Sequence, residues 1–257
     1  MKYWERGNPF VCLLVLLLVL PLTRGTELPA QSVRGEICLL WYNLENLYYP
    51  EDDSLTVDEE FTPWGGRHWT WSRYRDKLTA LAKVIIASGR GEPPELVAVC
   101  EVENAMVLEE LAAHPILKPY SYSVLHLDSP DHRGMDVASL IRKGRISLLS
   151  WEGITFVPPL KETRDIMHLV MQVGTDTLDL FLVHLLSKYR GAGATADLRR
   201  AQAEQLVLLI NSVCSQRQQA RFLITGDFND MFQAYAMEPL RNASFGGDSL
   251  ISLKPES

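Results

Sequence analysis

Four apolar segments, each ending in polar residues, constrain the fold of this chain more than any other feature. They are EICLLWYN (36–43), ELVAVCEVE (95–103), LDLFLVHL (178–185) and ARFLITGDFND (220–230). A strand that is apolar on both faces is typical of a sheet buried between two layers. The four segments alternate with longer polar and amphipathic stretches. This order predicts a layered α/β protein.

Two of the stretches between these segments have the periodicity of helices. In residues 71–88 the apolar side chains recur at helical spacing, and Gly89 follows as a stop signal. Residues 194–214 predict a long helix with Thr195 as its N-cap. The remaining apolar stretches predict a short helix at 105–113 and strands at 120–128, 136–142 and 166–173, the last in a hairpin with 178–185. No Pro/Gly/Ser-rich boundary divides residues 36–257, which we expect to form one domain.

The N-terminus is typical of a targeting segment. Lys2 and Arg6 precede the uninterrupted apolar run at 10–22. A single membrane anchor is the alternative, but the run is short for a bilayer, which takes about 20 residues. We therefore expect a signal peptide at 1–25 and a linker at 26–35. The protein would then be secreted or periplasmic, without stable membrane insertion after signal cleavage.

Charge and cysteine content exclude several classes of protein. The formal net charge is −7, so the chain does not coat a polyanion by bulk electrostatics, and any phosphate must be handled locally. Cys12 falls in the expected signal peptide, which leaves Cys38, Cys100 and Cys214 at wide spacing. This spacing predicts neither a disulfide framework nor a zinc site. We expect Cys38 and Cys100 to be buried as small apolar side chains.

The polar residues at the segment ends form a recurring pattern. They are Asn43, Glu101, His184, Asp227 and Asn229. In layered α/β folds, ligands bind at the loops that leave strand ends. Taken singly, asparagine and aspartate after a strand are usually turn residues, and a lone histidine in an apolar run is usually a core residue. Glu101 differs, because a carboxylate behind a buried run needs a partner or a metal. Together these side chains suit Mg²⁺ and the hydrolysis of a phosphate ester.

The order of six motifs carries a resemblance to a known family. They are YNLEN (42–46), VCEVEN (99–104), RGMDVA (133–138), TRD (163–165), VHLLS (183–187) and GDFND (226–230). This set resembles the endonuclease/exonuclease/phosphatase superfamily, and residues 61–78 are similar to its bacterial secreted branch. The resemblance implies a four-layer α/β/β/α sandwich of two mixed sheets with outer helices.

The resemblance also implies roles for individual positions. Its metal-binding residues correspond to Glu101, Asn43 and Asp227, its catalytic residues to His184, Asp227, Asn229 and Arg164, and its substrate-binding residues to Asn43, Arg164, His184 and Asn229. The implied ion is Mg²⁺, with Mn²⁺ or Ca²⁺ as alternatives. The implied substrate is a phosphate ester, either a nucleic acid or a small phosphodiester or phospholipid headgroup. We expect a monomer.

Two departures from the family pattern leave the activity open. The histidine motif reads His-Leu-Leu-Ser at 184–187, where the branch usually has His-Trp-Pro-Ser. The family also closes with a strand that bears an Asp-His or Asp-Gln pair, and no such pair follows Asn229, so we expect the last strands to be missing. One hypothesis is a secreted, metal-dependent phosphoesterase that acts by in-line attack of water. The other is a non-catalytic or remnant secreted binding domain.

Substrate choice is left open by the sequence. Trp64, Trp69 and Trp71 lie in a locally basic stretch and could stack on a base or a headgroup. The alternative, which we favour, is that they cover the start of the helix at 71–88. The acidic loop at 50–60 argues against a broad polyanion-binding face, and its spacing lacks the EF-hand pattern for Ca²⁺.

Overall fold

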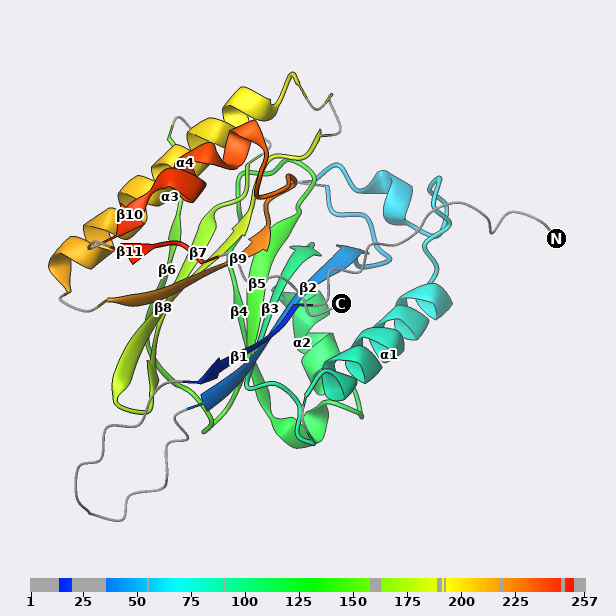
Figure 1. Ribbon diagram of the computed structural model, residues 1–257. Coiled ribbons are helices and arrows are strands. Elements are labelled where there is room, and N and C mark those ends of the chain that lie inside the picture. The colour runs from blue at the N-terminus through cyan, green and yellow to red at the C-terminus, as the bar shows by residue number, and fades with distance from the viewer. Residues whose placement is uncertain are drawn as a thin grey trace, which may run out of the picture.

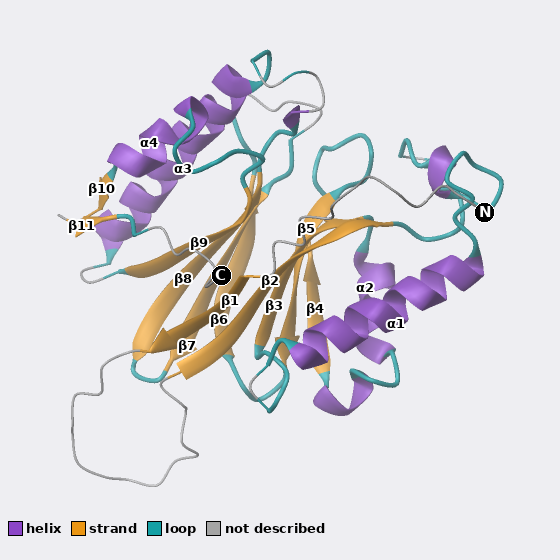
Figure 2. Ribbon diagram, turned by 45° about the vertical axis from the view of Figure 1, so that its right-hand side comes forward, coloured by secondary structure: helices purple, strands orange, loops and turns teal. Residues whose placement is uncertain are grey.

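Two β-sheets face each other, and helices cover their outer faces (Figures 1 and 2). This computed structural model describes residues 14–19, 36–54, 56–89, 91–157, 163–188, 191, 193–217, 220–245 and 248–251. Most of the expected signal peptide and the whole expected linker lie outside the described residues. Residues Leu14–Val19 form strand β1, which pairs antiparallel with β2 (Glu36–Leu47). No helix within the described ranges is long and apolar enough to cross a membrane.

The first sheet has the strand order β1-β2-β3-β5-β4. Its other strands are β3 (Leu96–Val102), β4 (Tyr122–His126) and β5 (Asp136–Arg142). Strands β2 and β3 run parallel, whereas β5 is antiparallel to both of its neighbours. The parallel pair brings the C-terminal ends of the first two apolar segments to the same edge of the sheet.

The second sheet has the order β6-β7-β8-β9. Its strands are β6 (Ser147–Ile154), β7 (Ile166–Val173), β8 (Asp176–His184) and β9 (Arg221–Asp227). Strands β7 and β8 form the predicted hairpin, and β8 runs parallel to β9. The ends of the last two apolar segments therefore also meet at one edge.

Alternation along the strands divides the apolar side chains among three cores. Leu39 of β2 and Leu180 of β8 lie in the core between the sheets, whereas Leu40 faces the outer helices. Helices α1 (Trp71–Ala87) and α2 (Ala105–Ala113) cover the first sheet, and α3 (Ala196–Gln216) and α4 (Glu238–Asn242) cover the second (Figure 2). The four-layer α/β/β/α sandwich of two mixed sheets is confirmed. That its last strands are missing stays a prediction.

Several short elements connect or follow the helices and strands of these layers. They are the 3₁₀ turns η1 (Glu59–Phe61), η2 (Lys118–Tyr120) and η4 (Tyr235–Met237), and the antiparallel strand pair β10 (Ser244–Phe245) and β11 (Asp248–Ser249).

Three details differ from the sequence predictions. Strand β6 was not expected, because it is an edge strand whose side chains are mostly exposed and show no apolar alternation. Thr195 stands at the N-cap position of α3, but its hydroxyl donates to the Gly191 carbonyl and accepts from Arg199 instead of capping the helix. Cys38 is only half-buried, whereas Cys100 is fully buried as expected.

A glycine fixes the spacing between β8 and β9. Gly226 has φ +145°, and a Cβ atom there would lie 1.9 Å from the carbonyl oxygen of Val183, its partner on β8. Neither backbone can give way inside a paired sheet. We predict that Gly226→Ala lowers the free energy of unfolding by about 2–4 kcal/mol. Gly66→Ala is the control, since a Cβ there meets nothing within 4 Å. Equal denaturant midpoints for the two variants would contradict the packing described.

A second stability prediction concerns the buried carboxyl of Glu103. Burial raises its pKa to about 7, although the amide N–H of Tyr49 donates to it at 2.5 Å and Asp58 adds to the increase. The folded state therefore binds a proton more tightly than the unfolded state, whose pKa is 4.5. Stability is thus lost as the pH rises from about 4.5 through 7, by at most about 3 kcal/mol.

The variant Glu103→Gln removes this titration. Its free energy of unfolding, measured by urea denaturation at several pH values, should fall less between pH 5 and about pH 7 than that of the wild type. Glu109→Gln, at an exposed position of α2, is the control and should follow the wild type. A Glu103→Gln variant with the same pH dependence as the wild type would show that Glu103 ionises normally.

Candidate active site

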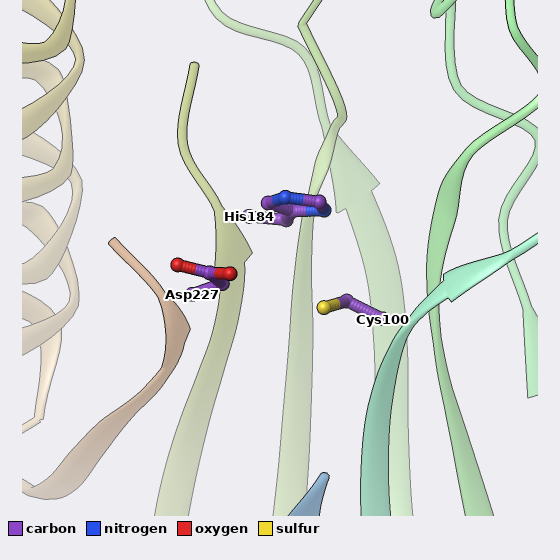
Figure 3. Close-up of side chains that lie close together, drawn as sticks. All are labelled: Cys100, His184 and Asp227. Carbon is purple, nitrogen blue, oxygen red and sulfur yellow. The ribbon is translucent and has the colours of Figure 1, made fainter. Parts of the chain in front are cut away.

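Four strand ends converge where the two sheets face each other. Asn43 on β2 stands opposite Cys100 on β3, and His184 on β8 stands opposite Asp227 on β9. Figure 3 shows His184 and Asp227 beside the fully buried Cys100. Parallel pairing brings the two polar ends of each sheet to one edge, and a hydrogen bond from Asn43 to Asp227 joins the two edges. The structure thus brings together the predicted site residues of both halves of the chain.

Asn43 joins the two sheets at this point. Its amide Nδ2 donates to Glu101 Oε1 at 3.0 Å and to Asp227 Oδ2 at 3.2 Å. Its Oδ1 accepts from the amide N–H of Glu45 at 2.7 Å, which fixes which side of the amide faces the carboxylates. One amide group therefore orients two carboxylates that come from opposite sheets.

Glu101 is presented by an irregular backbone. The register between β2 and β3 shifts after Asn43, and the register between β3 and β5 shifts after Cys100. Glu101 has φ +58° at this bulge, a conformation that non-glycine residues rarely adopt. The free-energy cost of such a backbone conformation is typical of functional sites, where surrounding contacts hold the strained residue.

A lysine supports the turn that holds Glu101. Glu45 and Asn46 have φ +53° and +62°, and the Asn46 amide N–H donates to Glu101 Oε2 at 3.1 Å. The ammonium of Lys77 on α1 donates to the Glu45 carbonyl at 2.6 Å and to the Asn46 carbonyl at 3.4 Å. Burial lowers the pKa of Lys77 to about 8, while Glu45 and Glu101 act in the opposite direction.

Asp227 and Asn229 form a local hydrogen-bonded corner. The Asn229 amide N–H donates to Asp227 Oδ1 at 2.8 Å, and Asn229 Nδ2 donates to the Leu185 carbonyl at 2.9 Å. The Leu185 amide N–H donates back to the Asp227 carbonyl at 2.8 Å. Asn229 has φ +49°, so the turn interpretation of this residue is correct as well. The corner places both side chains next to the loop that follows His184.

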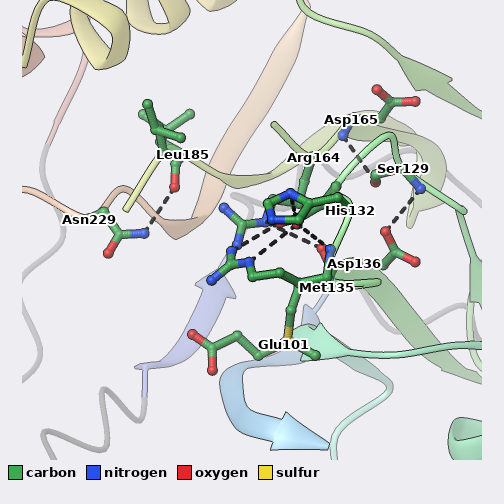
Figure 4. Close-up of polar contacts among 12 residues, drawn as sticks. Glu101, Ser129, His132, Met135, Asp136, Arg164, Asp165, Leu185 and Asn229 are labelled. Carbon is green, nitrogen blue, oxygen red and sulfur yellow. Dashed lines mark hydrogen bonds and ion pairs between the residues drawn. The ribbon is translucent and has the colours of Figure 1, made fainter. Parts of the chain in front are cut away.

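Arg164 is buried and held by an aspartate. Its Nε lies 2.8 Å from Asp131 Oδ2. The same Nε donates to the Met135 carbonyl at 3.3 Å (Figure 4). Arg133 pairs with the same carboxylate through Nη2 at 3.0 Å. Within the described chain, Nη1 of Arg164 has no hydrogen-bond partner, so the guanidinium keeps donors for an anion. One buried carboxylate thus orients two arginines.

His184 is held in its neutral form. Its side chain is almost fully buried, and burial, with Arg164 and Arg133 nearby, keeps its pKa well below the ordinary value. Its Nδ1 has no hydrogen-bond partner among the described residues. A neutral imidazole can donate through one ring nitrogen and accept through the other. His184 can therefore contact a phosphate oxygen without adding a charge.

The side chains present fit a divalent cation. Glu101 and Asp227 are oriented by the same amide, and neither forms an ion pair with a cationic side chain of the described residues. Mg²⁺ is bound in proteins through one or two carboxylates, together with water and substrate oxygens. In this structure the amide of Asn43 orients these carboxylates, and its role as a direct metal ligand stays a prediction.

Two residues of the site were missed by the sequence analysis. Asp131 lies in the loop before β5, and its signal was only an aspartate two residues before the arginine of the RGMDVA motif. Lys77 lies on the polar face of an amphipathic helix, where nothing in the sequence separates it from a solvent-exposed lysine. Both act on the predicted site residues through geometry that only the folded chain shows.

A further pair of polar residues lies away from these side chains. Asp136, from the third motif, is buried, with Oδ2 3.0 Å from His126 Nε2. Its Oδ1 accepts from the Ser129 amide N–H, and the Ser129 hydroxyl oxygen accepts from the amide N–H of Asp165 (Figure 4). These contacts fix the loop that carries Asp131.

Comparison with solved structures shows the same fold. TDP2 from Caenorhabditis elegans aligns with a TM-score of 0.53 and 15% identity, over 79% of this chain and 51% of that chain. The human Nocturnin catalytic domain with bound sulfate aligns with a TM-score of 0.55 and 14% identity, over 89% of this chain and 73% of that chain. ANGEL2, a 2′,3′-cyclic phosphatase, aligns with a TM-score of 0.54 and 18% identity, over 80% of this chain and 56% of that chain. The chain thus spans about half the length of the TDP2 structure.

The family is shown by its sequence model. The model described as the Endonuclease/Exonuclease/phosphatase family matches residues 38–244, which is most of the chain. A comparison with curated proteins found no match. The matched range contains every strand end that builds the site. The chain belongs to the endonuclease/exonuclease/phosphatase family.

Proposed function

We propose that this chain is a secreted, Mg²⁺-dependent phosphoesterase. The observation that carries the proposal is the amide of Asn43, which holds the carboxylates of Glu101 and Asp227 side by side. The buried guanidinium of Arg164 and the neutral His184 add donors for a phosphate. Members of the family hydrolyse phosphate esters, and ANGEL2 is named as a 2′,3′-cyclic phosphatase.

Each of the predicted site residues has a definable task in this reaction. Glu101 and Asp227 would hold Mg²⁺, which when bound polarises a phosphate oxygen and offsets its charge. Asp227 also orients the attacking water, because its carboxylate is fixed from both sides by Asn43 and the Asn229 amide. The water attacks in line with the leaving group, and Asn43 and Asn229 keep the carboxylate from rotating.

The developing negative charge needs donors that are already in place. Arg164 supplies a cation that Asp131 has oriented before the substrate arrives. His184 supplies a neutral donor from the opposite sheet. Such preorganised donors act in a site from which water is partly excluded, where they contribute more than they would in solution.

The structure narrows the surfaces that could recognise the rest of the substrate. Trp69 donates its indole N–H to the Tyr48 carbonyl at 2.8 Å, and Trp71 packs edge-on against Tyr49. Both also pack edge-on against Tyr74 in the first turn of α1, so they cover the helix start, as favoured from the sequence. Trp64 is 94% exposed and remains a candidate for stacking on a base or a headgroup. The phosphate ester itself is the only part of the substrate that we propose.

Secretion and the monomeric state are part of the same proposal. The basic start and the apolar run at 10–22 support a signal peptide. Cleavage after residue 25 would remove β1 and leave β2 at the edge of its sheet.

The first functional test removes the principal metal ligand. Glu101→Ala should lower Mg²⁺-supported hydrolysis of bis-p-nitrophenyl phosphate by at least about 10³-fold, since the cation loses one of its two carboxylates. EDTA should abolish wild-type activity on this substrate and on plasmid DNA. Glu109→Ala is the matched control and should keep wild-type rates. A wild-type protein without turnover on any phosphoester would instead support the non-catalytic binding domain.

The second test addresses the orientation of the arginine. Asp131→Asn removes the charge that holds Arg164 and Arg133, so kcat/KM should fall about 10- to 100-fold through misplacement of the guanidinium. Asp76→Asn, at an exposed position of α1, is the control. Rates are measured well below the unfolding temperature of each variant. If both variants have the same kcat/KM, Asp131 does not position the phosphate-binding arginine.

A further inference from the structure

The floor of the site contains a thiol that the proposed reaction does not use. Cys100 is fully buried and immediately precedes Glu101. Its Sγ, a ring nitrogen of His184 and a carboxylate oxygen of Asp227 all lie within 4.8 Å of one another (Figure 3). The three atoms come from β3, β8 and β9, so both sheets contribute to the group.

A second observation points to a ligand at this place. The side chain of His184 is 2% exposed, and within the described chain its Nδ1 has no hydrogen-bond partner. A buried polar atom without a partner is rare in a folded protein and calls for an explanation. A cation bound by this nitrogen would satisfy it.

We propose that Cys100, His184 and Asp227 form a binding site for a thiophilic divalent cation such as Zn²⁺. One sulfur, one imidazole nitrogen and one carboxylate oxygen are the three kinds of ligand that zinc uses in proteins. Mg²⁺ prefers oxygen ligands and does not select thiolates, so this set differs in chemistry from the carboxylate pair of Glu101 and Asp227.

The geometry requires only small movements. Zinc–ligand bonds of about 2.0–2.3 Å place neighbouring ligand atoms of a tetrahedral site roughly 3–4 Å apart. The three ligand atoms lie within 4.8 Å of one another, so each pair has to approach by at most about 1–2 Å to reach this geometry. Three protein ligands leave a fourth position for water or a phosphate oxygen.

Binding of the cation releases one proton from the protein. The sulfur coordinates as a thiolate, so the thiol proton of Cys100 leaves to solvent, while the neutral imidazole and the ionised carboxylate donate lone pairs. When Asp227 and His184 bind zinc, Asp227 can no longer orient the attacking water and His184 can no longer contact the phosphate. Bound zinc therefore inhibits the hydrolysis proposed above. This consequence rests on the proposed function, whereas the site itself does not.

The test uses Co²⁺ as a spectroscopic substitute for zinc, with the whole chain and without Mg²⁺, because Asp227 is shared with the proposed Mg²⁺ site. The wild type should bind one equivalent of Co²⁺ with a thiolate-to-cobalt charge-transfer absorption, and Zn²⁺ should displace it. Cys100→Ala should lose the absorption and bind Zn²⁺ at least about 100-fold more weakly. Cys38→Ala and Cys214→Ala are the matched controls and should keep it.

Several outcomes would overturn the proposal. These are a wild type without the charge-transfer absorption, an absorption that persists in Cys100→Ala, and one that disappears in Cys214→Ala. X-ray absorption at the zinc edge of the wild type gives an answer even if Cys100→Ala does not fold. One sulfur at about 2.3 Å from zinc supports the site, and a shell of oxygen and nitrogen alone rejects it. None of these measurements depends on phosphoesterase activity.

Discussion

The interaction on which the site depends is the pair of hydrogen bonds from one asparagine to two carboxylates. Asn43 reaches Glu101 along the first sheet and Asp227 on the second. This arrangement exists only when the two sheets are stacked, so the core between them is a condition of the chemistry. The strained backbone of Glu101 and Asn229 is tolerated because these contacts and the paired strands hold it.

The charges around this centre are arranged in a consistent way. Two carboxylates without a cationic partner lie beside a buried arginine that is held by Asp131 and beside a histidine kept neutral by burial. Negative charge is thus concentrated where a cation would bind, and donors are placed where a phosphate would lie. Cys100 adds a sulfur at the base of the same site. A sulfur ligand favours thiophilic cations such as Zn²⁺ over Mg²⁺, which oxygen ligands alone would not do.

Much of this organisation is predictable from the sequence, because strands that are buried on both faces appear in it as continuous apolar segments. The ends of those strands identified Asn43, Glu101, His184 and Asp227. Edge strand β6 was missed, since exposed side chains carry no such pattern. The supporting residue Asp131 was missed for another reason. Its role depends on which side chain a loop brings next to Arg164, and this is decided by tertiary packing.

The central claim is that Glu101 and Asp227 hold a divalent cation at the junction of the sheets. Anomalous diffraction from crystals grown with Mn²⁺ tests it most directly. The account predicts one strong peak at bonding distance, about 2.0–2.2 Å, from carboxylate oxygens of both residues. A peak confined to another place, such as the His126–Asp136 pair, with none at Glu101, would contradict it.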